Sequence, residues 1–521
     1  MDNMYFLLYV LSHIIYCYCI GQIHYKEIIM QKKLLSLAIA SVLSTGFIAS
    51  SSVLAEEKAQ TAPPPSTQAA PETAQTVESK SGFNIVYQSD KKAVDKEYLP
   101  FGDVNVLAKN IMRFIIDNAK VKKPTVTTIF PVFEKELAGG LEKKLFIEVA
   151  ANTADTGVTT GTVHSPVVEA EITKKEGTLN WKGLAGTFDF AQDSTEINTD
   201  LKAKGLVLTK GKDKLTVSHL DFKGVVNNQF VPLEGVLDFP SVTFKAQKDD
   251  INFALLGTKA TATRSKASSG VTLTDSNFHI DSASLSSEGD TFSLETLNVT
   301  TANKDNKETI DTLVTLALKK LVLPKELMEG DDRTVSYHNN ISVKNIDAAA
   351  LLDIQNTLTE LEKQNIASNM LGFALFGKLM ELAPQLLAKS PEIAISNIAL
   401  TTPKGNLVGD IQLAVDGSKP IDLKTPEPFI QALTGNAHIT IDKTLLTLII
   451  SQGIYEDMKD EAADAKAQAD LRKQAEQAAQ QQIQGLVAQN LFTKQGNAYV
   501  LKAKLAQRKL MLNGKEMPLP F

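Results

Sequence analysis

The chain has 521 residues, of which 43% are hydrophobic, and 54 Lys and Arg residues stand against 60 Asp and Glu residues, a net charge of −6. This mildly acidic balance, without a basic stripe that carries interleaved aromatic residues, excludes nucleic acid as an expected partner. The only cysteines are Cys17 and Cys19, so thiol catalysis, disulfides and cysteine-based metal sites are not expected in the rest of the chain.

Residues 30–55 have the three parts of a secretory signal. Two lysines near the start form a positive n-region, residues 34–48 form an apolar h-region, and Val53 and Ala55 fit a small-residue cleavage site. The sequence therefore predicts export to the periplasm with cleavage of the signal. The alternative is an uncleaved inner-membrane anchor, which would keep this segment in contact with the bilayer while the rest of the chain faces the periplasm.

Residues 1–29 differ in composition from the rest of the chain, because they hold both cysteines and five of the ten tyrosines. We interpret them as a non-native N-terminal extension before a true start at Met30. A first membrane helix over residues 4–20 is the alternative, at the short end for spanning a bilayer. Residues 56–82 are rich in Pro, Ala and Thr, which predicts a flexible linker before a domain that covers residues 83–521.

Between residues 120 and 325 hydrophobic and polar residues alternate. Segments such as "KKLFIEVAANT" and "DKLTVSHLDFKG" show this period, and turn signals such as "KGKD" and "SSEGD" recur between them. The pattern predicts an antiparallel meander with one dry and one wet face. In "TFSLETLNV" the alternation slips by one residue between Leu294 and Leu297, which predicts a bulge or a bend.

Helical segments interrupt the alternation. Residues 101–120 carry apolar residues near a helical spacing. Asp347 is placed to accept hydrogen bonds from the first free N–H groups of a helix over residues 348–364. Residues 370–388 are apolar nearly all round, which predicts a buried core helix over the concave face of the sheet. A membrane span is the alternative for this segment, although it would place two charged residues and a proline in the bilayer.

The C-terminal part adds a hairpin, a long helix and short strands. Residues 393–400 and 407–415 are typical of the two strands of a hairpin. Residues 443–486 predict one long helix, apolar at its start and then rich in Ala and Gln. Its mixed-charge part around residues 459–484 indicates a solvated face, with a homodimer contact as the alternative. The dipeptide Asn513-Gly514 suits a type I′ turn, because both positions need positive φ.

Together these elements predict an α+β fold. We expect a long, curved, mostly antiparallel sheet of meanders and hairpins, with buried helices on its concave side and a long Ala/Gln-rich C-terminal helix. A domain of this length is able to bury a large core without disulfides.

Two segments carry a family resemblance. The ending "RKLMLNGKEMPL" and the block "LMELAPQLLAKSPEIAISNIALTTPKGNLVGDIQLAV" resemble the YdgA-like family of bacterial envelope proteins, whose biochemistry is unassigned. Pro384, Lys389 and Pro391 stand where the family pattern expects them. The sequence departs from the pattern where Arg508 or Lys509 replaces a frequent Gly, and in its Pro-rich linker. The resemblance implies a periplasm-facing protein with an N-terminal membrane signal or anchor, and it implies no catalytic residue.

Three His/Asp pairs are the candidates for metal chemistry. On a strand, residues two apart share a face, so such a pair offers two ligands. The pairs are His219 with Asp221, His279 with Asp281, and His438 with Asp442. A wet strand face explains them without a metal, because a zinc centre needs three or four converging ligands. No G-x-S-x-G, H-E-x-x-H, P-loop or G-x-G-x-x-G motif occurs in the sequence. We therefore predict no catalytic, cofactor-binding or metal-binding residues.

The sequence predicts a non-enzymatic periplasmic or envelope protein that scaffolds or maintains the cell surface, with self-association as one mode of action. The alternative is an apolar-groove protein that binds or transfers lipid or lipoprotein, in which the helix at residues 370–388 is removable and the dry sheet face shelters acyl chains. The expected partners are thus a second copy, a lipid or another envelope protein. A groove lined by Leu, Ile and Val would favour the alternative, and a sheet face filled by the helix would count against it.

Overall fold

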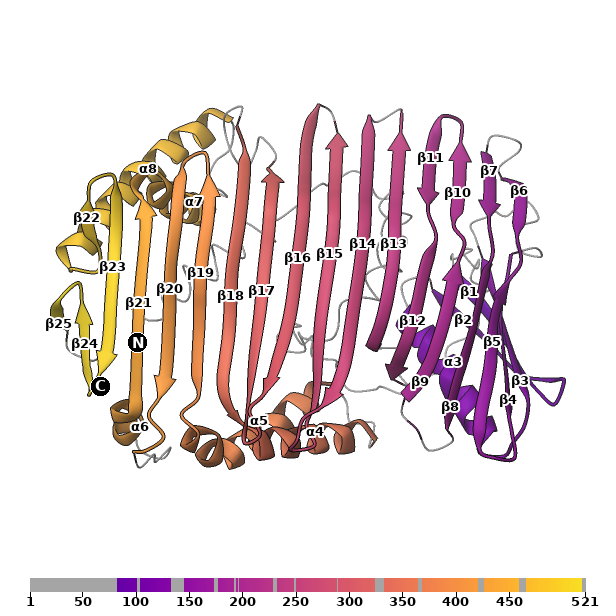
Figure 1. The fold of residues 1–521 in the computed structure, drawn as a ribbon. Coiled ribbons are helices and arrows are strands. Elements are labelled where there is room, and N and C mark those ends of the chain that lie inside the picture. The colour runs from indigo at the N-terminus through magenta and orange to yellow at the C-terminus, as the bar shows by residue number, and fades with distance from the viewer. Residues whose placement is uncertain are drawn as a thin grey trace, which may run out of the picture. The chain divides into compact units, whose positions relative to one another are not determined.

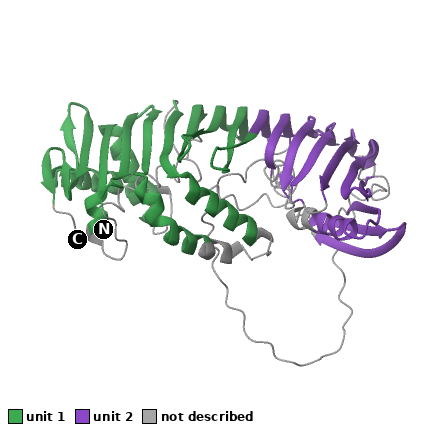
Figure 2. Cartoon of the chain, turned by 60° about the horizontal axis from the view of Figure 1, so that its bottom comes forward, with its two compact units in different colours: residues 1–28, 263–521 green, residues 29–262 purple. Residues whose placement is uncertain are grey.

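The computed structural model describes residues 82–517 apart from the gaps 101–103, 133–144, 173–176, 192–193, 195, 228–231, 248–249, 288, 324–331, 364–367, 420–425 and 459–464. The predicted extension, signal and nearly all of the predicted linker therefore lie outside the described residues. The chain divides into two compact units, unit 1 with residues 1–28 and 263–521 and unit 2 with residues 29–262 (Figure 2). The division falls inside strand β14 (Ile251–Lys266), and the two units are described separately.

Unit 2 is an antiparallel sheet with one described helix, α3 (Val104–Ala119). Its strands, besides most of β14, are β1 (Gly82–Ser89), β2 (Lys92–Pro100), β3 (Thr125–Val132), β4 (Ile147–Thr153), β5 (Val158–Ser165), β6 (Val168–Ile172), β7 (Gly177–Trp181), β8 (Leu184–Ala191), β9 (Glu196–Ala203), β10 (Leu206–Lys210), β11 (Asp213–Val217), β12 (Leu220–Asn227) and β13 (Pro232–Ala246). One half of β13 pairs with β12 and the other half with β11. The apolar side of α3, with Ile111 and Ile115, packs against Ile85, Ile129 and Val149 to form the core of this unit.

Unit 1 is an antiparallel meander of long strands (Figure 1). They are β15 (Thr272–Ser287), β16 (Asp290–Asp305), β17 (Thr309–Val322), β18 (Thr334–Asp347), β19 (Glu392–Thr402), β20 (Gly405–Val415), β21 (Leu433–Asp442), β22 (Thr493–Gln495), β23 (Ala498–Ala506), β24 (Lys509–Leu512) and β25 (Lys515–Met517). From β15 to β21 each strand pairs with the next one in the sequence, and β21 then pairs with β23. The predicted hairpin of residues 393–415 is confirmed as β19 and β20.

Five helices lie in the described part of unit 1, and in Figure 2 they are on one side of its sheet. They are α4 (Ala348–Lys363), α5 (Ser368–Ala388), α6 (Pro426–Ala432), α7 (Lys443–Met458) and α8 (Ala465–Ala488). The main core forms where Leu445 and Leu446 of α7 and Ile483 of α8 pack against Leu400 and Ile439 of the sheet. The pair α4 and α5 runs along the opposite ends of the strands (Figure 1).

The predicted fold class was wrong. The described residues hold 25 strands and only six helices, so the protein is mostly β rather than α+β. The helices are not a buried layer, because α5 leaves Phe376, Leu379 and Met380 exposed. Apolar residues all round a helix favour burial on several sides, but their pattern does not say what covers them. The sequence analysis also did not predict that several strands would be 14–16 residues long.

The prediction of a single long C-terminal helix over residues 443–486 was also wrong. The segment forms two helices, α7 and α8, which pack against each other, and the chain then returns to strands β22–β25. The side chains of Ile449 and Val487 join the same core, and the guanidinium of Arg472 lies 4.7 Å from the ring centroid of Tyr455. A run of Ala and Gln favours helix but carries no signal for a reversal of the chain.

Two local predictions are confirmed, and a third is confirmed in part. Asp347 caps α4, because its Oδ1 accepts a hydrogen bond from the Ala350 N–H at 2.7 Å. Asn513 and Gly514 have φ values of 48° and 84°, as a type I′ turn requires. Thr296 lies at the predicted slip in β16 and has a φ of 52°, but the pairing of β16 with β15 and β17 keeps its register there, so the irregularity is not a bulge. Within the described ranges, no helix is long and apolar enough to cross a membrane.

Candidate functional site

One face of unit 1 carries an apolar strip across four strands. Cross-strand pairing aligns Val314 with Ile341 and Ile341 with Ile395, and it then aligns Ile395 with Ile411. A second row, two residues further along each strand, consists of Val343, Ile393 and Leu413. We define the apolar strip by the two rows together, that is by Val314, Ile341, Val343, Ile393, Ile395, Ile411 and Leu413. Directly paired residues of an antiparallel sheet share a face, so these side chains form one surface.

The apolar strip is the uncovered continuation of the unit 1 core. Ile395 and Ile411 pack against the buried cluster that α7 and α8 cover. One step further from those helices, Ile393 is 53% exposed and Leu413 is 44% exposed. Ile341 is exposed as well. Contiguous exposed aliphatic side chains on a sheet face mark an interaction surface more often than single exposed ones do.

A line of irregular positions separates the covered part of this face from the strip. The strand pairing shifts between Leu318 and Leu321, between His338 and Asn340, and between Ile395 and Ile398. At the last shift Asn397 has a φ of 54°, and its N–H donates to Asp410 Oδ1 at 2.9 Å. An extra residue in one strand shifts the side-chain alternation of that strand by one position. Ile395 and Ile398 therefore point to the same face although they are three residues apart.

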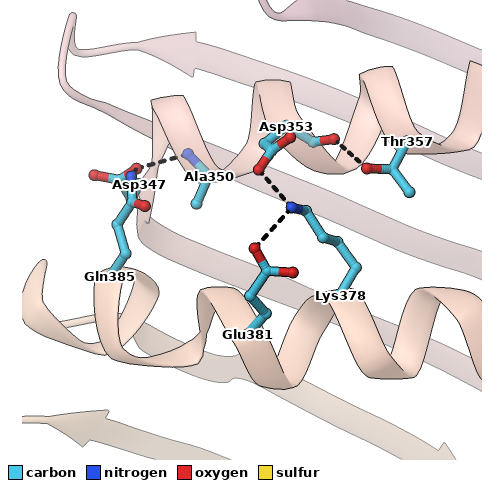
Figure 3. Close-up of polar contacts among 7 residues, drawn as sticks. All are labelled: Asp347, Ala350, Asp353, Thr357, Lys378, Glu381 and Gln385. Carbon is cyan, nitrogen blue, oxygen red and sulfur yellow. Dashed lines mark hydrogen bonds and ion pairs between the residues drawn. The ribbon is translucent and has the colours of Figure 1, made fainter.

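The helix pair α4 and α5 is joined by polar contacts on one side of α5 (Figure 3). Lys378 Nζ lies 2.8 Å from Asp353 Oδ2 and 3.1 Å from Glu381 Oε1. The hydrogen bond to Asp353 is the main reason why the pKa of Lys378 is raised. Gln385 Nε2 donates at 2.7 Å to Asp347 Oδ1, the oxygen that also caps α4. These contacts fix the polar side of α5 to its neighbour.

The opposite side of α5 is apolar and uncovered. A helix turns about 100° per residue, so Phe376 and Met380 lie on the side away from Lys378 and Gln385. Phe376 is 65% exposed, and Met380 and the adjacent Leu379 are exposed too. Helices of globular proteins normally turn the apolar side inward and the polar side to water. The α5 helix buries Leu382 on the side of Lys378 but also leaves apolar residues uncovered, and we call the exposed residues Phe376, Leu379 and Met380 the apolar stripe.

Two cavities lie elsewhere in the described residues. One of about 330 Å³ lies at the line of irregular positions, and its lining includes Lys319 and His338 but no carboxylate. The other, of about 410 Å³, belongs to unit 2, where Asp90 of the lining pairs with Lys123 at 3.7 Å. Neither lining has the extended aliphatic surface of the strip, so the strip and the α5 stripe are the stronger candidate site.

The three His/Asp pairs do not form one site. His279 Nε2 lies 2.8 Å from Asp281 Oδ1, whereas His219 faces Asp238 at 3.7 Å rather than its predicted partner. In the third pair, Asp442 Oδ2 accepts the Asn406 N–H at 2.8 Å. Among the described residues there is no group of three or more His, Cys, Asp or Glu side chains that could hold a metal ion.

Sequence reasoning missed the residues of the strip as a site. The segment "EIAISNIAL" shows the alternation of Ile393 and Ile395, but a dry strand face predicts the same pattern whether a helix covers it or not. The pairing of Ile341 with Ile395 joins residues 54 positions apart. No local signal in the sequence specifies such a pairing.

Comparison with known proteins identifies a family whose function is unknown. Residues 208–520 match the family described as "Bacterial protein of unknown function (DUF945)". The matched residues include the whole apolar strip and the apolar stripe of α5. No curated protein and no solved structure gives a significant match.

Proposed function

Because the chain belongs to the DUF945 family of bacterial proteins, which has no assigned function, we propose its role from the geometry of unit 1: it binds the acyl chain of a lipid or a lipidated protein on the apolar strip. The observation that carries this proposal is the exposure of Ile393 and Leu413 on a face that is continuous with the core. The protein then acts by binding rather than by catalysis.

The dimensions of the strip suit a hydrocarbon chain. The row from Val314 to Ile411 crosses four strands. Strands lie about 4.8 Å apart, so the row is roughly 14 Å long. Burial of a methylene group contributes about 0.8 kcal/mol. Ten methylenes half buried on an open face would give ~4 kcal/mol, a dissociation constant of about 1 mM, whereas full burial would give about 1 μM.

Two exposed positions on the strip and one on the other face allow a direct test. The double variant Ile393→Ser/Leu413→Ser should weaken the binding of a fluorescent long-chain fatty acid about tenfold, because each change removes about one methylene equivalent of contact. Val408→Ser is the matched control: Val408 is 48% exposed on β20, five residues from Leu413 and therefore on the opposite face. Equal binding by the double variant, the control and the parent protein would refute the proposal.

The proposed compartment is the periplasm. It is supported by the signal pattern of residues 30–55 and by the resemblance to the YdgA-like envelope family. A reporter enzyme that is active only outside the cytoplasm, fused after Phe521, should be active. Activity of a cytoplasm-specific reporter at the same position would contradict this assignment.

The envelope-scaffold role predicted from the sequence needs no apolar ligand. Native mass spectrometry of the full chain, followed by extraction and identification of lipids, separates the two roles. Lipid that copurifies with the parent protein and is lost from the Ile393→Ser/Leu413→Ser variant supports acyl binding. A lipid-free dimer supports scaffolding instead.

A further inference from the structure

The helix α5 has a polar side that is engaged and an apolar side that is not. Lys378, Gln385 and Lys389 follow one another along one side of the segment. Each contacts a carboxylate outside α5: Asp353, Asp347 and Glu308, respectively. The apolar stripe on the other side has no cover among the described residues and includes the strongly exposed Phe376. This arrangement leaves α5 with an apolar surface available for a further contact.

The C-terminal end of α5 is fixed next to the apolar strip. Ile393 of the strip follows five residues after Ala388, the last residue of α5. Asn345 Nδ2 donates to the Ser390 carbonyl at 3.1 Å, and the Gly417 N–H donates to Ser390 Oγ at 3.1 Å. These bonds tie the segment after α5 to the ends of β18 and β20, the two strands that flank β19. The strip and the stripe are therefore neighbours along the chain.

We propose that α5 is the cover of the acyl site: its apolar stripe closes over the apolar strip and forms the second wall around the acyl chain. This inference rests on the proposed function for the identity of what fills the closed site. The cover would also bury the acyl chain fully, which the open strip cannot do. Full rather than half burial of ten methylenes lowers the dissociation constant about a thousandfold.

The charges on α5 favour this cover over a membrane-surface contact. Helices that lie on anionic membranes present Lys and Arg from their polar side to the lipid headgroups. Lys378 is the only cation among the described side chains of α5, and it already contacts Asp353 and Glu381. A polar side that is neutralised within the protein suits a helix whose apolar side closes on its own sheet.

Disulfide cross-linking tests the closure directly. In a Cys17→Ser/Cys19→Ser background, which has no other cysteine, Met380→Cys/Leu413→Cys should form a disulfide within one chain, because closure brings the stripe to the strip. A disulfide requires Cα atoms roughly 4.4–6.8 Å apart, so its formation reports true contact. The matched control is Met380→Cys/Val408→Cys, with the second cysteine on the other face of β20.

We expect the strip pair to cross-link at least tenfold faster than the control pair, and faster still with a long-chain fatty acid present. Cross-linking no faster than the control, or only between two chains, would overturn the cover and would assign the stripe to a second copy in the latter case. A fast cross-link within one chain that the fatty acid does not affect would uphold the cover and count against acyl binding. As an independent readout, Met380→Ser should weaken fatty-acid binding several-fold, and unchanged binding would contradict the second wall.

Discussion

Removal of the Asp347 side chain should loosen the start of α4. Asp347 is only 5% exposed, and its Oδ1 accepts both the Ala350 N–H and the Gln385 Nε2–H at 2.7 Å. Loss of an N-cap carboxylate costs about 1 kcal/mol. Loss of the second hydrogen bond adds about 0.5 kcal/mol, because the exposed Gln385 side chain regains water. Asp347→Ala should therefore favour local opening by about 1.5 kcal/mol, or roughly tenfold.

The assay for this change is hydrogen exchange of the backbone amides in the first two turns of α4, in the full chain. Gln385→Ala removes only the second bond and should speed exchange about twofold, which corresponds to ~0.5 kcal/mol. Asp347→Asn keeps an oxygen that can accept the Ala350 N–H and should exchange nearly as the parent does. The capping argument would be refuted if Asp347→Ala changed exchange less than Gln385→Ala, or if Asn and Ala at this position behaved alike.

Other perturbations test the sheet and the attachment of α5. Gly161→Ala should lower the free energy of unfolding by about 2 kcal/mol in a urea titration, because the Phe188 ring occupies the space of the new Cβ; an unchanged midpoint would contradict this. Thr296→Gly should raise it by about 1 kcal/mol, since Thr at a φ of 52° is strained, and a lower midpoint would show that the strain is absent. The hydrogen bond from Lys389 lowers the pKa of Glu308, so this pair stabilises the fold above the ordinary carboxylate pKa and loses its effect only as the pH falls through the lowered value. The hydrogen-exchange rate of backbone amides near the end of α5, corrected for the intrinsic rate, should thus be constant from about pH 6 to 8 and rise below about pH 4. A rise near neutral pH would show that the pair of Glu308 and Lys389 does not control this rate.

The sequence allowed the local features of the fold to be predicted. The cap at Asp347, the turn at Asn513 and the slip at Thr296 each depend on a few adjacent residues. Side-chain hydrogen bonds to the backbone and the cost of positive φ act over the same short range. Such features can therefore be predicted from the sequence without knowledge of the tertiary structure.

The site depends on contacts that no short segment encodes. The strip exists because Ile341 pairs with Ile395 and because α7 and α8 end before they reach Ile393. The exposure of Phe376 likewise depends on which side of α5 meets α4, and the ion pair between Lys378 and Asp353 sets that orientation. Hydrophobic periodicity identifies an apolar face but not its neighbour, so it predicted burial where the structure shows an open surface.

The meander of unit 1 has a consequence for how such a chain forms and changes in length. From β15 to β21 every strand finds its partners immediately before and after it in the sequence. Contacts of this kind have short loops to close, so adjacent hairpins are able to zip together successively as the polypeptide emerges from the ribosome. Insertion or deletion of a whole hairpin would lengthen or shorten the array without rewiring the remaining ladders, as in repeat proteins. Related proteins could in this way differ in the number of strands, and so in the length of the sheet, while they keep the same architecture.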